Sequence, residues 1–228
     1  MKKTFTTKNI VLIAMFSALA LVLHLFDFSI PVIAPEFYKL DLSEIPVLIG
    51  SFIMGPLAGV FIEAIKILLK LLVKGTSTAY VGDLANFIIG CAFVVPASLI
   101  YKYKKTKMGA FIGMAVGILV MAVAGIAINY WVLIPFYVKA FGMPLDAIIG
   151  MGAKINGAIS NKFTFVLICV GPFNILKGVI DSLITAVVYK RISSFIKEIG
   201  SKNKNIDSKK ISIWLNQNTI VKLKHRKI

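Results

Sequence analysis

Long apolar stretches separated by short polar segments make up most of the chain. These stretches are 10–26, 45–73, 84–101, 108–138 and 163–188. A helix needs about 20 mainly apolar residues to cross about 30 Å of hydrocarbon, and each stretch approaches or exceeds that length. The pattern predicts an all-α integral membrane protein.

The stretch 45–73 is long enough for two helices, and Gly55-Pro56 lies inside it. Proline lacks the backbone N–H and clashes with the preceding helical turn. We therefore expect one helix to begin inside the loop 41–45 and end before Gly55, and another to cover 57–73. Pro135 is likewise expected to break the stretch 108–138.

The positive charge is concentrated in three segments, 1–8, 102–107 and 190–228. They hold 18 of the 26 Lys and Arg residues and only two acids, a difference equal to the formal net charge of +16. Basic loops of membrane proteins lie on the cytoplasmic side. Any two of these segments must then be separated by an even number of membrane-crossing helices. Dividing the stretch 45–73 into two helices meets this condition. We predict six transmembrane helices with both termini cytoplasmic.

Composition agrees with a membrane location. Apolar residues form 58% of the chain, against about 45–50% in soluble domains. We expect a six-helix domain over 1–192 and a basic, partly disordered cytoplasmic tail over 193–228. The first stretch could also be a cleavable signal peptide, but Asp27-Phe28-Ser29 is a poor cleavage site because small residues are required there.

Several kinds of chemistry have no motif here. His24 and His225 are the only histidines, and no phosphate-binding Gly-x-x-x-x-Gly-Lys-[Ser/Thr] loop exists. The sequence therefore predicts neither a metal centre nor nucleotide hydrolysis. The segregated charge argues against nucleic acid as a partner. What remains is polar residues at membrane depth, which by default indicate a ligand or ion pathway.

The stretch 163–188 carries the most informative polar residues. Asn174, Lys177 and Asp181 are spaced three and four apart, which places them on one helix face. They could bind a ligand, or Lys177 and Asp181 could form an ion pair that only joins helices.

Two amides lie in otherwise apolar stretches. Asn129 precedes Tyr130 and Trp131, and Asn86 follows Gly82-Asp83. Buried amides often only join helices, but together with the polar face of 163–188 they offer donors and acceptors beside aromatic rings. That set suits a planar heterocycle with a polar edge better than a simple ion.

Other features have plainer interpretations. Glu63, Lys66 and Lys70 share a face and suggest an internal salt-bridge stripe, and His24 reads as a surface residue near a helix end. Ala14 and Ala18 form a small-x-x-x-small pattern that permits close helix contact but is common in membrane helices.

Five motifs carry a family resemblance over about residues 8–192. They are Lys39-Leu40-Asp41, Gly82-Asp83-Leu84-Ala85-Asn86-Phe87, Asn129-Tyr130, Ala140-Phe141-Gly142-Met143-Pro144-Leu145-Asp146 and Pro172-Phe173-Asn174-x-Leu176-Lys177-Gly178. With them the chain resembles the riboflavin-specific substrate-binding subunits, or S-components, of energy-coupling factor (ECF) vitamin transporters. The family more often has Glu at position 83, so Asp83 keeps the charge but not the length.

The resemblance implies a six-helix protein of the bacterial cell membrane that binds riboflavin from outside as transported ligand, without a cofactor. It implies a transmembrane coupling subunit, docked at Ala14 and Ala18, and two ATPase subunits that supply the hydrolysis, so the chain itself is not an enzyme. Tyr130 and Trp131 are candidates for stacking on the ring. The implied riboflavin-binding residues are Lys39, Leu40, Asp41, Gly82, Asp83, Asn86, Asn129, Asn174 and Lys177.

Two alternatives stay open. The chain could be an S-component for another vitamin or a free-standing carrier, or it could be a membrane enzyme or scaffold. Bound flavin would separate the interpretation as a riboflavin-specific S-component from both alternatives.

Overall fold

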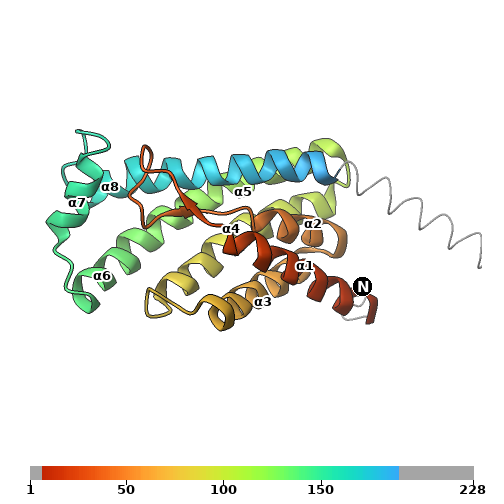
Figure 1. The fold of residues 1–228 in the computed structure, drawn as a ribbon. Helices are drawn as coiled ribbons and strands as arrows, with labels where there is room; N and C mark the ends of the chain where they lie inside the picture. Colours follow the sequence, from red (N-terminus) through yellow and green to blue (C-terminus); the bar gives the residue numbers. More distant parts are fainter. Residues whose placement is uncertain (1–6, 190–228) are drawn as a thin grey trace, which may run out of the picture. The chain divides into compact units, whose positions relative to one another are not determined.

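The computed structural model describes residues 7–189, and nearly all of its regular structure is helical (Figure 1). The first half contains α1 (Thr7–Leu25), α2 (Glu44–Met54), α3 (Pro56–Lys74) and α4 (Val81–Tyr103). The predicted tail, 193–228, lies outside the described residues.

The second half contains two long helical segments. α5 (Lys107–Ile128) passes through a π-helical turn, η1 (Asn129–Leu133), into α6 (Ile134–Ala140). After α7 (Leu145–Ala153), α8 (Lys162–Phe165) leads through a second π-helical turn, η2 (Val166–Val170), into helix that continues to residue 189. We call the segment 162–189 the last helix.

Four of these helices are long and apolar enough to span a membrane. They are Thr7–Leu25, Val81–Tyr103, Lys107–Ala140 and Lys162–Tyr189. α2 is apolar but has only 11 residues, and α3 has 19 residues but carries Glu63, Lys66, Lys70 and Lys74. The prediction of six crossings with cytoplasmic termini therefore stays a prediction.

The division predicted at Gly55-Pro56 is present. Gly55 has φ of 107°, a conformation that side chains disfavour and glycine adopts freely. Pro56 begins α3, where its missing N–H costs nothing because first-turn N–H groups have no helical partner.

The expected break at Pro135 is wrong. Helix continues through Lys107–Ala140 for 34 residues. The π-helical turn that ends at Leu133, two residues before Pro135, uses wider hydrogen bonding, which absorbs the local misfit that proline causes. At about 1.5 Å per residue this helix is about 50 Å long, so its end projects well beyond a hydrocarbon layer about 30 Å thick unless it is strongly tilted.

The loop between α1 and α2 contains a small antiparallel sheet, which the all-helical prediction lacked. β1 (Phe28–Ser29) pairs with β2 (Lys39–Leu40), with Phe28 opposite Leu40. α7 was also not predicted, because nine residues between two polar segments leave no membrane-length apolar stretch.

Two packing regions position the site. α1, α2 and α3 contact one another, and α4 packs along α5. The α1–α2 loop packs on the other half of the chain, where Leu40 joins an apolar cluster with Ile148, Phe165 and Phe173. The loop is therefore fixed between the two halves, directly beside the polar residues of the last helix.

Candidate functional site

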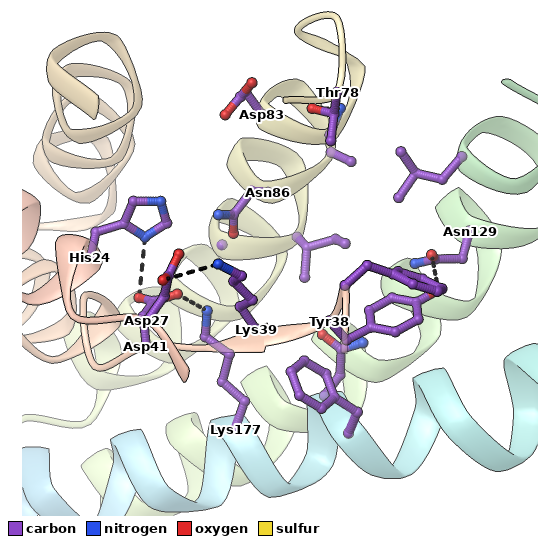
Figure 2. A pocket seen from close by; sticks show the side chains of 18 of the residues that line it. His24, Asp27, Tyr38, Lys39, Asp41, Thr78, Asp83, Asn86, Asn129 and Lys177 are labelled. Carbon is purple, nitrogen blue, oxygen red and sulfur yellow. Dashed lines mark hydrogen bonds and ion pairs between the residues drawn. The ribbon is translucent and has the colours of Figure 1, made fainter. Parts of the chain in front are cut away.

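A cavity of about 210 Å³ lies between the α1–α2 loop, α4, α5 with η1, and the last helix (Figure 2). Eight of the nine residues predicted for riboflavin line it: Lys39, Asp41, Gly82, Asp83, Asn86, Asn129, Asn174 and Lys177. The fold thus brings together residues that are up to 138 positions apart in the sequence. Their binding role stays a prediction.

Leu40 is the exception. It is fully buried in the apolar cluster and does not line the cavity. Successive residues of an extended strand point to opposite faces, so Lys39 and Asp41 face the cavity while Leu40 faces the core. Leu40 therefore holds the loop in place by packing on the side that faces away from the cavity.

Asp41 is the centre of the polar wall. Its Oδ2 accepts a hydrogen bond from Lys177 Nζ at 2.8 Å, and its Oδ1 accepts one from the Ser43 backbone N–H at 2.9 Å. His24 Nδ1 lies 3.3 Å from the same Oδ1. Burial alone would raise the pKa of Asp41, but Lys177 and His24 hold it well below its usual range. Asp41 is therefore ionised and fixes the Lys177 ammonium at the cavity.

Of the two alternatives for the last helix, the ion pair between Lys177 and Asp181 is not formed, because Lys177 bonds to Asp41 from the loop. The interpretation of His24 as a surface residue is wrong, since His24 is only 7% exposed. The folded loop covers it and supplies a carboxylate partner, which helix periodicity cannot reveal.

Asn129 is held by two hydrogen bonds inside the protein. Its Nδ2 donates to the Gly125 carbonyl at 2.8 Å, and its Oδ1 accepts from the Tyr38 hydroxyl at 2.7 Å. Burial raises the pKa of Tyr38 well above its usual value, so the hydroxyl remains a donor. One N–H of Asn129 is left for a ligand.

Asn174 is oriented in a similar way. Its Nδ2 donates to the Val170 carbonyl at 2.9 Å. Gly125 makes this possible, since a Cβ there would come within 2.5 Å of that nitrogen. The amide oxygen of Asn174 is left as an acceptor, and Lys177 follows one turn further along the same helix.

The aromatic wall differs from the expected one. Tyr130 and Trp131 do not line the cavity. Lys162 Nζ lies 3.9 Å from the Tyr130 ring centre, and Trp131 is 71% exposed. The aromatic residues that do line the cavity are Phe37, Tyr38, Tyr137 and Phe173. Tyr38 directly precedes the Lys39-Leu40-Asp41 motif, a signal that sequence reasoning could have used.

Ion pairs surround the rest of the cavity. Asp27 accepts from Lys39 at 3.3 Å and from Lys74 at 2.8 Å. Burial alone would raise the pKa of Asp27, but the hydrogen bond and charge of Lys74, with Lys39, lower it overall. Asp83 accepts from Lys70 at 2.5 Å and from Thr76 at 2.6 Å. Sequence reasoning missed Asp27 and Lys74, whose pairing depends on how the loop folds back onto α3.

Glu63 and Lys66 do form the predicted internal pair, at 2.6 Å, but Lys66 also binds Glu44 of α2 at 2.8 Å. Within residues 7–189, no group of three or more His, Cys, Asp or Glu residues is arranged to hold a metal ion. The side chains that line the cavity offer hydrogen bonds, charge and aromatic surface.

Ala14 and Ala18 lie together on the exposed side of α1, among the exposed aliphatic residues Val11, Met15 and Leu19. The opposite side of α1 is buried, where Ser17 Oγ donates to the Ile13 carbonyl at 2.8 Å. The two alanines are therefore accessible, as a docking face requires, but nothing in the fold identifies what docks there.

Residues 8–189 match the model of the ECF transporter substrate-specific component. The chain belongs to the family of ECF transporter S-components.

Similar proteins include the riboflavin transporter RibU of Staphylococcus aureus, 32% identical over 84% of this chain and 94% of that protein. The riboflavin transporter FmnP of Bacillus subtilis is 29% identical over 84% of this chain and 95% of that protein. A solved structure of the S component of a bacterial ECF transporter covers 83% of this chain and 98% of its own, at 33% identity and a TM-score of 0.66. This S-component is a multi-pass protein of the cell membrane, and its family is one of transporter subunits.

Proposed function

We propose that this S-component binds riboflavin in the cavity beside Asn174 and Lys177 and serves its uptake. The observation that carries the proposal is the convergence of Asn129, Asn174 and Lys177 on one wall of an aromatic-lined cavity. The names of the similar proteins in S. aureus and B. subtilis support it.

The polar wall matches the edge of the isoalloxazine ring. That edge alternates acceptor, donor and acceptor. The remaining N–H of Asn129 and the free N–H groups of Lys177 are donors, while the oxygen of Asn174 is an acceptor. The ribityl hydroxyls would then meet Asp83, Asn86 or the loop residues Lys39 and Asp41.

The aromatic residues complete the ring site. Tyr38 lies 5.7 Å from Phe173 between ring centres, and both line the cavity. Flat aromatic surfaces favour offset stacking or edge contacts with another ring. The apolar dimethylbenzene end of the flavin would lie against this surface.

The test is identification of the ligand. Protein purified in detergent from riboflavin-containing cells should be yellow, and mass spectrometry should find about one riboflavin per chain. Lys177→Met should lose the bound flavin, whereas the exposed Lys154→Met should keep it. Another vitamin in the parent protein, or no small molecule after growth with excess riboflavin, would contradict the proposal.

We propose further that the subunit works with one transmembrane coupling subunit and two ATPase subunits, and that both of its ends are cytoplasmic. The family membership and the basic segments 1–8 and 102–107 support this. In a background without native cysteines, a cysteine at Lys104 should resist an impermeant thiol reagent added outside cells, and one at Lys139 should react. Labelling at Lys104 would overturn the topology.

A further inference from the structure

Asp181 lies one helical turn after Lys177, and the cavity side chains do not use it. It is fully buried, and neither of its carboxylate oxygens has a hydrogen-bond partner among the described residues. Buried carboxylates in native proteins are almost always paired or hydrogen-bonded, because losing water strongly disfavours the charged form. Asp181 therefore requires an explanation.

Among the charges that the structure describes around Asp181, no cation is free. Lys177 of its own helix, Asp41 of the loop, Glu44 of α2 and Lys66 of α3 all act on it electrostatically. Lys177 is already bonded to Asp41 at 2.8 Å. Lys66 is bonded to two carboxylates, Glu44 at 2.8 Å and Glu63 at 2.6 Å.

Two ammonium groups therefore already face three carboxylates in this interior. An ionised Asp181 would make four carboxylates against two ammonium groups, and His24 beside Asp41 could offset only one of the excess charges. A bound proton removes the charge of Asp181 at once. Thr185 lies four residues further along and is also fully buried, with Oγ1 unpartnered. Its place on the same face makes it a suitable acceptor for the carboxylic O–H.

We propose that Asp181 is a proton-binding site in the membrane interior and a reserve counter-ion for Lys177. While Asp41 holds Lys177, Asp181 is a neutral carboxylic acid. When Asp41 is neutralised or withdrawn, Asp181 releases its proton to solvent through the cavity and pairs with Lys177 as a carboxylate. The two residues are four apart, so they can meet without any change of helix position.

Infrared difference spectroscopy on ligand-free protein tests the first half without depending on riboflavin. The parent should show a carboxylic-acid carbonyl band that shifts in heavy water and disappears in Asp181→Asn. The exposed Asp146→Asn of α7 is the matched control and should leave the band unchanged. A parent spectrum with no band assignable to Asp181 would mean that the carboxyl is ionised, and the proposal would be wrong.

Two further variants test the reserve role. Asp41→Asn should abolish the Asp181 band, because Lys177 then needs a new partner. Lys177→Met should retain the band, because no ammonium remains to favour ionisation. Retention of the band in folded Asp41→Asn, or its loss in Lys177→Met, would overturn this role.

Thermal unfolding without ligand gives an independent measurement. Asp181→Asn should change the unfolding midpoint by about 1 °C or less in the parent, because the amide replaces a neutral acid of similar shape. In the Asp41→Asn background the same change should lower it by several °C, since it removes the carboxylate that replaces Asp41 as the counter-ion of Lys177. Equal shifts in the two backgrounds would contradict the proposal.

Discussion

α1 and the last helix are both apolar and of membrane length, yet they face different surroundings. The buried share is 22% in the most apolar part of α1 and 50% in that of the last helix. α1 turns Ala14, Ala18 and large aliphatic residues outward. The last helix turns Asn174, Lys177 and Asp181 inward. Similar hydropathy therefore conceals two different surfaces, an apolar one that faces outward and a polar one that is buried.

The largest expected effect concerns α1. Ala14→Trp or Ala18→Trp should abolish co-purification with the coupling subunit, because a bulky side chain prevents close helix approach. Riboflavin affinity should stay within about twofold of the parent, since this face is remote from the polar residues of the cavity. Val11→Trp adds the same bulky side chain on the exposed side of α1 but outside the Ala14 and Ala18 pair, and its complex is compared with those of the two alanine variants. Survival of the complex in both alanine variants would mean that another surface docks the partner.

The matching change in the last helix should act on the ligand instead. Asn174→Leu removes an acceptor and a donor from the cavity, leaving ligand atoms unpaired in a site with little water. We expect a loss of about 2–4 kcal/mol, or about 30- to 1000-fold in riboflavin affinity. Titration of flavin fluorescence measures it, and the exposed Asn156→Leu is the control. Unchanged riboflavin affinity in Asn174→Leu would mean that the Asn174 amide has only a structural role.

A smaller effect is expected at the aromatic wall. Tyr38→Phe keeps the ring contacts but removes the 2.7 Å hydrogen bond to Asn129. Freed from that bond, the amide of Asn129 loses its fixed orientation, so affinity should fall by about 1 kcal/mol, or about fivefold. The midpoint of thermal unfolding, measured with and without riboflavin, separates the loss of affinity in Tyr38→Phe from a general loss of stability. An affinity equal to that of the parent would show that Tyr38 does not orient Asn129 for binding.

The smallest effect belongs to the ion pairs of Asp27, which are partly exposed and screened by salt. Because the folded-state pKa of Asp27 is depressed, its pairs stabilise the protein above the ordinary carboxyl pKa. That contribution is lost as pH falls through the lower folded-state value. The midpoint difference between the parent and Asp27→Asn should therefore be small at pH 7 and shrink towards zero at acidic pH. A difference that grows on acidification would contradict the pairing.

Local signals predicted much of this architecture. Apolar length located the membrane helices, Gly55-Pro56 located the division between α2 and α3, and helical spacing placed Asn174 and Lys177 on one face. These features depend on residues near one another in the sequence. Leu40 was included among the site residues through the family resemblance, because a motif taken as a block does not show that alternate strand residues face opposite ways.

Features that depend on distant segments could not be predicted in this way. The bonds from Asp41 to Lys177 and from Tyr38 to Asn129 join positions 136 and 91 residues apart. Both require the α1–α2 loop to fold between the two halves of the chain. The π-helical turn before Pro135 had no clear signal either, because proline more often ends a helix than follows a wider turn.

We propose that the polar face of the last helix binds the flavin rather than joining segments of the protein. Riboflavin affinity in a cycle of Lys177→Met, Asp41→Leu and the double variant is the measurement that separates the two. The double variant removes both charges of the 2.8 Å ion pair, so neither charge of that pair is left without the other, and ligand-free unfolding checks that it folds. We predict at least tenfold weaker binding in Lys177→Met and no recovery in the double variant. Recovery of the parent affinity would show that Lys177 is present only for Asp41, and that the polar face does not bind the flavin.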